Sequence, residues 1–303
     1  MREISAPVLL IFFNRPEKFE KVFTKVREAK PSKLYLFQDG ARNSQEENAI
    51  LACRAIAEKV DWKCEVHKNY QERNLGCGQG PYQAISWVLK NEEQAIILED
   101  DCVPINSFFS FCDNLLEKYK NDTRVGMISG LNHFETWDCG SSSYLFAKTG
   151  ANWGWATWRR VWEKYDYRLE CLEDEHILNL LKGIFLSKRI ENSILKHWLR
   201  TRAKVLRNEK LSYWDLQFEA NKYIYNWLSI VPDRNMICNI GIGEDSTHNA
   251  GESLFNNLKT YEMNEIRHPQ YIIQDTAYDK KYYGYACPNI FIKLRNKLRS
   301  MRK

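Results

Sequence analysis

Predicted strands and helices alternate over the first 130 residues, and this alternation limits the possible folds more than any other feature of the sequence. Residues 7–13 (PVLLIFF) form a continuous apolar run, typical of a strand buried on both faces. Strands joined through helices pair in parallel and leave helices on both faces of the sheet. The sequence therefore predicts an α/β fold with a Rossmann-like, mostly parallel sheet. Further strands are expected at 33–38, near 63–67, at 95–98 and near 124–129, and helices near 16–29, over 44–60, from 81 to about 90 and near 106–119.

Two local signals indicate where helices should begin. Ser44 and Glu47 have the spacing of a capping box ahead of a helical apolar stripe. Residues 76–80 (GCGQG) predict a Gly-rich loop, and Pro81 suits the first turn of the helix that follows it. We therefore expect one helix to start at the capping box and another to start near Pro81.

The second half of the chain has a less regular pattern. Residues 152–165 are rich in Trp, and residues 171–210 have a largely helical, basic pattern. Residues 216–228 favour a helix, residues 229–239 favour a strand, and residues 250–285 are mixed. This half is expected to complete the fold without further regular strand–helix units.

The composition is that of a globular protein kept in a reducing compartment. The hydrophobic fraction of 44% and the charged fraction of 27% are ordinary for a folded domain. The nine cysteines form neither paired CxxC spacings nor a Cys/His zinc pattern, which favours reduced thiols. The N-terminal apolar run is too short for a signal peptide, and no stretch approaches the roughly 18 apolar residues that span a bilayer. We therefore expect a cytoplasmic protein, or one peripheral to the inner face of the cell membrane.

Basic charge is concentrated in two segments, although the net charge is only +5. Between Lys182 and Lys210 basic residues far outnumber acidic ones, and the segment from Lys293 to Lys303 contains no acid. Neither segment carries a nucleic-acid-binding motif, so no nucleic acid partner is expected. Residues 289–303 fit either an amphipathic tail that contacts an anionic membrane or a solvated helix that closes the fold.

Polar clusters follow three of the predicted strands at the point where each strand ends. In open α/β sheets, ligands bind beyond the carboxyl ends of the strands. We therefore expect one ligand site to which all three clusters contribute. The clusters are Asn14-Arg15, Gln38-Asp39 and Glu99-Asp100-Asp101.

The acidic triplet at residues 99–101 directly follows an apolar run. Three adjacent carboxylates are costly there unless a positive charge lies among them. Hard oxygen ligands suit Mn²⁺ or Mg²⁺, which would neutralise a phosphorylated ligand as a Lewis acid. The alternative is a solvated turn that caps the next helix, and the triplet by itself leaves both interpretations open.

Several other polar residues have both a chemical and a structural interpretation. Asp39 could accept the imide N–H of uracil or form an ordinary Asp-Gly turn, and Arg15 could bind phosphate, stack on a base or lie on the surface. Asp215 could act as a general base beside a stacking wall formed by Trp214, or it could cap a helix. His248 could reach a metal or a diphosphate, or it could be a surface histidine in a loop.

Taken in order, these segments resemble those of N-acetylglucosaminyltransferase I and its bacterial relatives, inverting GT-A glycosyltransferases that use UDP-GlcNAc and Mn²⁺. The shared order and spacing are much more specific than any single segment. The resemblance implies a GT-A fold with a C-terminal acceptor-binding part. The similar segments are PVLLIFFNRPEKFEKVF, LYLFQDG, AIILEDDCVPINSFFSFCDNLL, RVGMISGLN, NWGWATWRRVWEKY, SYWD and GEDSTH.

The resemblance also implies a role for each matching residue. Asp101 would be the metal ligand, Asp100 would face the ribose or diphosphate, and Glu99 would face the donor sugar. Asp215 would be the catalytic base. The remaining expected site residues are Arg15, Gln38 and Asp39 for the nucleotide, Gly154 and Trp155 for the donor sugar, Trp214 beside the base, and His248 near the diphosphate and metal.

Two features depart from the family pattern. Leu216 stands where a second acid usually follows the Trp-Asp pair. The stretch between Trp162 and Asp215 is also longer than in the family, because it contains the basic block at 171–210.

Together these inferences predict a metal-dependent, inverting glycosyltransferase. It would move GlcNAc or another hexose from a UDP-sugar to a hydroxyl of a glycan or lipid-linked glycan, in the synthesis of a bacterial surface polysaccharide or glycolipid. Residues 1–130 would bind the nucleotide sugar, residues 131–288 would bind the donor sugar and the acceptor, and residues 289–303 would form the basic tail.

Two alternative functions remain open. A nucleotidyltransferase shares a similar sheet and acidic metal sites, but it would favour a Gly-rich phosphate loop after the first strand, where this chain has Asn14, Arg15 and Pro16. A non-catalytic glycan-binding or membrane-binding protein would keep the aromatic and basic features without binding a nucleotide.

Overall fold

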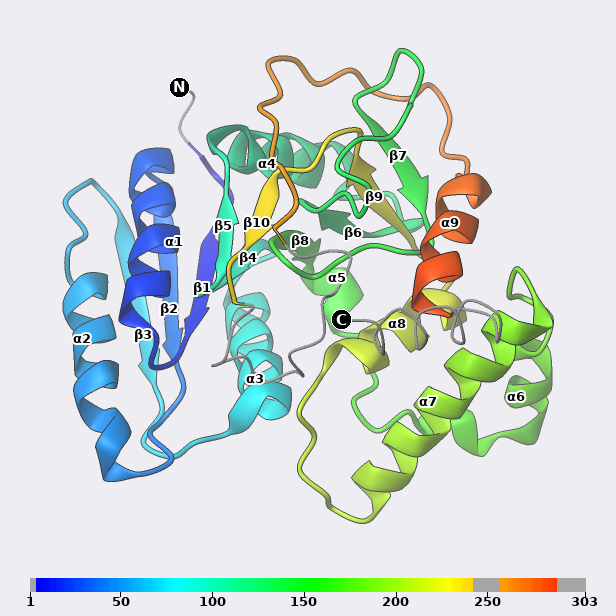
Figure 1. Cartoon of the computed structure of the whole chain (residues 1–303), viewed down its shortest axis with the longest axis horizontal. Helices are drawn as coiled ribbons and strands as arrows, with labels where there is room; N and C mark the ends of the chain where they lie inside the picture. Colours follow the sequence, from blue (N-terminus) through cyan, green and yellow to red (C-terminus); the bar gives the residue numbers. More distant parts are fainter. Residues whose placement is uncertain (1–3, 242–256, 288–303) are drawn as a thin grey trace, which may run out of the picture.

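The computed structural model describes residues 4–241 and 257–287 of the chain. An eight-stranded sheet lies at its centre, with helices on both faces (Figure 1). Its strands are β1 (Val8–Phe12), β2 (Lys33–Gln38), β3 (Glu65–Tyr70), β4 (Gln94–Glu99), β6 (Val125–Ser129), β7 (Tyr144–Ala147), β8 (Trp155–Trp158) and β9 (Leu228–Pro232).

The strand order is β3-β2-β1-β4-β8-β6-β9-β7, and only β7 and β8 run antiparallel to the others. All five residues of β1 are buried, as expected for a strand with helices on both sides. The predicted α/β fold with a Rossmann-like, mostly parallel sheet is therefore confirmed. A two-stranded sheet of β5 (Cys102–Pro104) and β10 (Ile237–Asn239) adjoins it.

The order of the strands reverses between β1 and β4. From β1 the chain moves outward through β2 to β3, and it then returns to β4 on the other side of β1. Ile11 pairs with Glu99 in register, so the two strands end at the same edge. Open α/β sheets bind ligands in the crevice at such a reversal point. The topology therefore places the ends of β1 and β4 where a ligand is expected.

The helices follow the predicted pattern closely at α1 and α4, which have the bounds expected from the sequence. The chain between β9 and α9 is described only in part, because residues 242–256 lie outside the described residues. The helices are α1 (Pro16–Ala29), α2 (Glu47–Ala57), α3 (Gly76–Asn91), α4 (Asn106–Tyr119), α5 (Arg159–Trp162), α6 (Glu175–Leu181), α7 (Lys188–Leu206), α8 (Asp215–Ile224) and α9 (Thr276–Ala286).

The predicted capping box at Ser44 is wrong. Asn43 is the cap instead, because its side-chain oxygen accepts a hydrogen bond from the backbone N–H of Gln45. The three residues that follow Asn43 form a 3₁₀ turn, and α2 begins only at Glu47. The α-helix therefore starts two residues later than a capping box with Ser44 as the N-cap predicts.

The predicted Gly-rich loop before Pro81 is also wrong, because α3 already begins at Gly76. The carboxylate of Asp39 accepts hydrogen bonds from the backbone N–H groups of Leu75 and Gly76, at 2.8 Å each. A carboxylate stabilises the N-terminal end of a helix through the orphan N–H groups and the helix dipole. The carboxylate of Asp39, the residue after β2, thus caps the glycine segment and lets it form the first turns of the helix.

A second apolar cluster lies under α6, α7 and α8, separate from the core around the sheet. In α7 the buried residues include Ile194 and Trp198, and the Trp198 ring lies 5.7 Å from the ring of Tyr223 in α8. The basic block at 171–210 is therefore a folded helical layer attached to α8.

Two predicted features lie outside the described residues: His248 and the basic tail at 289–303. Within residues 4–241 and 257–287, no helix is long and apolar enough to cross a membrane.

Candidate functional site

Arg15 connects the ends of β1 and β4. Its guanidinium forms an ion pair with Asp100, and its Nη1 lies 3.0 Å from Oδ2 of Asp101. Burial alone would lower the pKa of Arg15, but the carboxylates of Asp100 and Asp101 outweigh this effect and raise the pKa. Arg15 and the two aspartates, which belong to different polar clusters in the sequence, thus meet at one edge of the sheet.

Glu99 is the first acid of the triplet and faces the same edge. Burial, followed by repulsion from Asp101 and Asp100, raises the pKa of its carboxyl group to about 8. The buried carboxyl group of Glu99 therefore resists ionisation more than an exposed glutamate does. A positive ligand at this edge would favour ionisation of Glu99.

Asp39 has a structural role in this geometry. Its Oδ1 accepts from the backbone N–H of Gly40 and Leu75, and its Oδ2 accepts from the N–H of Gly76 and the amide of Asn74. An ionised carboxylate offers about four acceptor positions, and these four bonds occupy them. The expected contact with a uracil imide would require one of these bonds to break, so the geometry does not favour it.

Gln38 is fully buried and also has a structural role. Its amide nitrogen donates to the carbonyls of Phe13 and Ile50, and its carbonyl accepts from Arg54 Nε at 2.7 Å. It joins the end of β2 to the loop after β1 and to α2. These bonds give Gln38 a structural role, and its contact with a nucleotide stays a prediction.

The Gly-Trp segment approaches the site through residues other than the expected ones. Trp155 is only 1% exposed and stacks on Trp214 with ring centroids 5.6 Å apart. Gly154 has a φ of +64°, and an added Cβ would lie 2.4 Å from Ile237 Cδ1. Both residues are explained by backbone conformation and packing, whereas Asn152 and Trp153 line the site.

A cleft of about 340 Å³ lies at the ends of β1 and β4. We call it the switch-point cleft. Arg15, Asp39, Trp214 and Asp215 line it together with the acidic triplet, so most of the residues expected from the sequence do meet. Among residues 4–241 and 257–287, five acidic side chains and two basic ones, those of Arg15 and Arg42, line this cleft. An anionic ligand would therefore need an additional positive charge to bind there.

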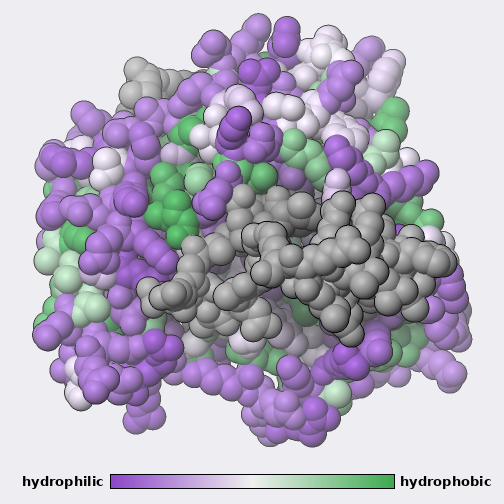
Figure 2. All heavy atoms as spheres, in the orientation of Figure 1, coloured by the Kyte–Doolittle hydropathy of each residue, from purple (hydrophilic) through white to green (hydrophobic). Residues whose placement is uncertain are grey.

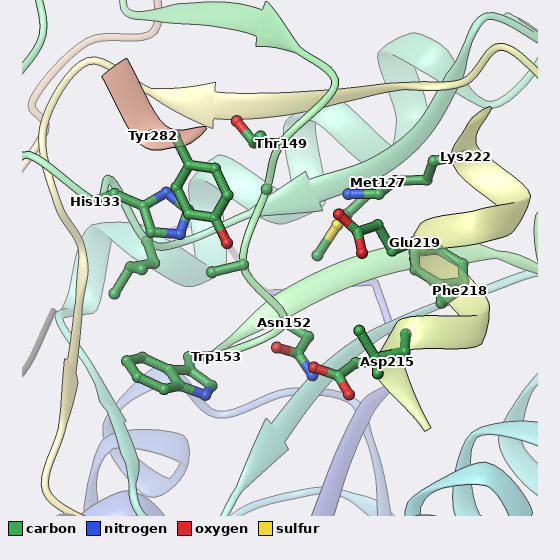
Figure 3. Close-up of a pocket in the computed structure, with 14 residues that line it drawn as sticks. Met127, His133, Thr149, Asn152, Trp153, Asp215, Phe218, Glu219, Lys222 and Tyr282 are labelled. Atoms are coloured by element: carbon green, nitrogen blue, oxygen red, sulfur yellow. The ribbon is translucent and has the colours of Figure 1, made fainter. Parts of the chain in front are cut away.

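A second pocket of about 250 Å³ adjoins the cleft. We call it the α8 pocket, because α8 forms one wall of it. Figure 3 shows Asn152 beside Asp215, Trp153 at one end, and His133 and Tyr282 on the side opposite Glu219. Asn152, Trp153 and Asp215 line both the cleft and the α8 pocket. Asp215, the first residue of α8, thus stands where the two spaces meet.

The α8 pocket contains functional candidates that the sequence analysis missed. Glu219 and Lys222 lie on α8 and point toward one another in Figure 3. Burial is the main cause that raises the pKa of Glu219 and lowers the pKa of Lys222. Asp215 and Glu219 are four residues apart, a spacing that places two side chains on one face of a helix. This spacing was the available signal for Glu219, and adjacency to the Gly-Trp motif was the signal for Asn152 and Trp153.

The described residues offer limited protein ligands for a metal ion. No three His, Cys, Asp or Glu side chains among them converge on one point. Mg²⁺ is commonly held by one or two carboxylates together with the phosphates of a substrate. Asp101 lines the cleft, and its main described partner, Arg15, is itself a cation. A divalent cation at this edge would therefore have Asp101 as a protein ligand and would need further ligands from a phosphorylated molecule.

Comparisons with known proteins add only distant similarities. No protein-family model and no curated protein matches the chain. It is similar to the structure of a UDP-glucose pyrophosphorylase complexed with UDP-glucose, with 13% identity, a TM-score of 0.26, and coverage of 52% of this chain and 70% of that one. It is also similar to 4-diphosphocytidyl-2C-methyl-D-erythritol synthase from Anaerococcus prevotii, with 13% identity, a TM-score of 0.33, and coverage of 73% and 99%. Neither similarity is close enough to assign an activity.

Proposed function

We propose that this chain is a glycosyltransferase that moves a sugar from a nucleoside diphosphate sugar to a hydroxyl group of an acceptor. One observation carries the proposal: Asp215 lies in the wall shared by the switch-point cleft and the α8 pocket. A sugar transfer needs a donor site and an acceptor site that meet at a base. The resemblance of the sequence to inverting GT-A enzymes names the same aspartate as the base.

The switch-point cleft is the proposed donor site. It lies outside the carboxyl ends of β1 and β4, where this class of sheet binds nucleotides. Arg15 lines the cleft, and its guanidinium has five N–H donors, not all of which are used by Asp100 and Asp101. The remaining donors are available to a phosphate or to the nucleoside.

A divalent cation, Mn²⁺ or Mg²⁺, would be held by Asp101 and would supply positive charge to the diphosphate as it leaves. We infer the need for a cation from the excess of acidic over basic side chains among the described residues that line the cleft. Arg15 keeps Asp101 and Asp100 in place beneath the diphosphate. Glu99 faces the same space and would hydrogen-bond the hydroxyl groups of the donor sugar.

The α8 pocket is the proposed acceptor site. Trp153 presents an aromatic ring, on which a sugar ring can stack, and Asn152 presents an amide that bonds hydroxyl groups. Glu219 lies one helical turn beyond Asp215 and would accept a hydrogen bond from a second acceptor hydroxyl. The acceptor is therefore proposed to be a glycan, free or lipid-linked.

In the proposed step, the carboxylate of Asp215 takes the proton of the acceptor hydroxyl. The acceptor oxygen forms its bond to the anomeric carbon as the bond from that carbon to the diphosphate oxygen breaks. The bonding electrons leave with the nucleoside diphosphate, and attack from the opposite face inverts the anomeric configuration. Base assistance of this kind contributes about 10²–10⁴-fold to a rate.

The experiment that tests the proposal combines binding with product analysis. Thermal shifts would be measured with UDP, GDP, CMP and dTDP, each with and without Mn²⁺, because a ligand that binds the folded state raises its stability. The nucleotide that binds would then be supplied as a panel of its sugar conjugates with glycan acceptors, and the products identified by mass spectrometry. We expect a Mn²⁺-dependent shift with UDP and a new glycoside from a UDP-sugar.

Two results would contradict the proposed glycosyltransferase activity. Release of pyrophosphate from a nucleoside triphosphate and a sugar phosphate, without a glycoside product, would identify a nucleotidyltransferase. The absence of any nucleotide-induced shift would favour a non-catalytic glycan-binding protein.

A further inference from the structure

Helix α7 carries a row of basic side chains on the side that faces away from the core. Arg189, Lys196 and Arg200 are all exposed. They are spaced by seven and four residues, which at about 100° per residue keeps them within roughly 20° of one line along the helix. Trp198, nine residues after Arg189, is buried on the opposite side and packs against Tyr223 of α8. The row therefore forms the outer surface of the helical layer.

These three cations have no ion pair with any residue that the structure describes. Several other cations of this region do have partners among the described residues. Lys188 pairs with Glu191, Arg202 with Glu173, Arg207 with Glu209, and Lys204 lies over the ring of Tyr213. The positive charge of the row is therefore not neutralised by described residues, and it is exposed to solvent or to a binding partner.

Apolar side chains accompany the basic row. Leu199 is 42% exposed between Lys196 and Arg200 in sequence, and Leu206 is 47% exposed at the end of the helix. Hydrophilic side chains predominate along the lower edge of the molecule, where α7 lies, with scattered apolar groups among them (Figure 2). At about 100° per residue both leucines lie roughly 80–100° around the helix from Arg189, so they flank the basic row, while the apolar face of α7 packs against the protein.

We propose that the α7 face, defined by Arg189, Lys196, Leu199 and Arg200, binds an anionic phospholipid surface. Its positive charge complements acidic headgroups, and Leu199 flanks the basic row. The single Trp of α7, Trp198, is buried, so this helix exposes no Phe, Tyr or Trp ring on which a base could stack, and this favours lipid over nucleic acid. Since α7 packs on α8, a membrane at this face would lie one helix away from Asp215.

The test measures sedimentation of the full chain with phosphatidylcholine vesicles that either contain or lack phosphatidylglycerol. The native chain should bind only the anionic vesicles, and added salt should weaken the binding. The variant Arg189→Gln/Lys196→Gln/Arg200→Gln should bind about a hundredfold less tightly, because each basic residue near an anionic surface contributes roughly fivefold. Leu199→Ser should weaken binding without changing its salt dependence.

The matched control is Lys21→Gln/Lys63→Gln/Lys90→Gln, which removes the same charge from exposed positions on and near α1 and α3. It should bind the vesicles nearly as well as the native chain. The proposal fails if the native chain ignores anionic vesicles, or if the α7 variant binds as tightly as the control, which would assign binding to another segment such as 293–303. It also fails if the α7 face binds duplex DNA more tightly than vesicles.

Discussion

Arg15 and Asp100 join the two central strands at the edge of the sheet where the ligand is proposed to bind. Arg15 follows β1, Asp100 follows β4, and the guanidinium donates to both oxygens of the carboxylate. The side chain of Asp100 is only 3% exposed, and a further hydrogen bond from the N–H of Phe13 at 3.2 Å completes its environment. The position of the acidic triplet thus depends on a positive charge supplied by the neighbouring strand.

Replacement of Arg15 by Ala should therefore destabilise the fold strongly. It leaves the buried Asp100 carboxylate without its cation, and removal of one partner of a buried pair costs about 3–5 kcal/mol. Urea unfolding at neutral pH would measure the loss. Arg27→Ala, which breaks the exposed pair with Asp61, is the control and should have little effect. Equal losses for the two variants would contradict the role assigned to Arg15.

Gly241 should be required for metal-dependent nucleotide binding. A Cβ added at this position would lie 2.0 Å from Oδ2 of Asp101, so in Gly241→Ala the carboxylate or the backbone at residue 241 has to move, and either change alters the position of the two relative to one another. We expect the variant to lose the Mn²⁺-dependent thermal shift with UDP. Gly284→Ala is the matched control, since nothing lies within 4 Å of its added Cβ and alanine stabilises a helix by roughly 0.5–1 kcal/mol over glycine. A normal UDP shift in Gly241→Ala would exclude Asp101 from the cation site.

Substitutions at Asp215 and at Glu219 should affect different kinetic parameters of the proposed reaction. Asp215→Asn removes the base, so kcat should fall by about 10²–10⁴-fold while UDP binding with Mn²⁺ is retained. Glu219→Gln keeps the base and alters only the acceptor pocket, so KM for the acceptor should rise and kcat should change less. Steady-state kinetics with varied acceptor would separate the two effects. Substantial activity in Asp215→Asn would assign the base to another residue.

The pair of carboxylates on α8 should also select against acidic acceptors. An acceptor with its own carboxylate would enter a pocket lined by Asp215 and Glu219, one helical turn apart, where the cation Lys222 already lies near Glu219. We expect Glu219→Gln to narrow the difference in kcat/KM between a neutral glycoside and the matching uronic acid. An unchanged ratio in the variant would show that Glu219 does not face the acceptor.

The sequence predicted the fold and the location of the site because both depend on local patterns. The apolar runs define β1 and β4, and the polar residues after them, including Arg15 and Asp101, must meet once the strands pair in parallel. Their convergence in the switch-point cleft could therefore be predicted without information about contacts between distant residues.

Other features depend on contacts between distant residues and were not predictable in this way. The start of α3 is stabilised by Asp39, which follows β2 and is 36 residues before Leu75, so the glycine run at 76–80 alone indicated a loop. Gly154, which has a positive φ, separates two tryptophans with different surroundings: Trp155 is buried in the core, whereas the half-buried Trp153 lines the cleft. These outcomes follow from tertiary packing rather than from residue type.

His133 should make stability depend on pH below neutrality. Burial, followed by repulsion from Lys222, lowers the pKa of this histidine to about 3. The unfolded chain binds a proton at the same imidazole near pH 6.5, so the unfolded state holds more protons between these two values. The contribution of this group to the free energy of unfolding is therefore fully present above about pH 6.5 and declines as the pH falls, by up to about 1.4 kcal/mol per pH unit.

Urea unfolding of the native chain and of His133→Gln, compared from about pH 5 to about pH 8, would isolate this contribution. The difference in unfolding free energy should grow up to about pH 6.5 and then stay constant, and a difference independent of pH would show that the imidazole is not held in its neutral form.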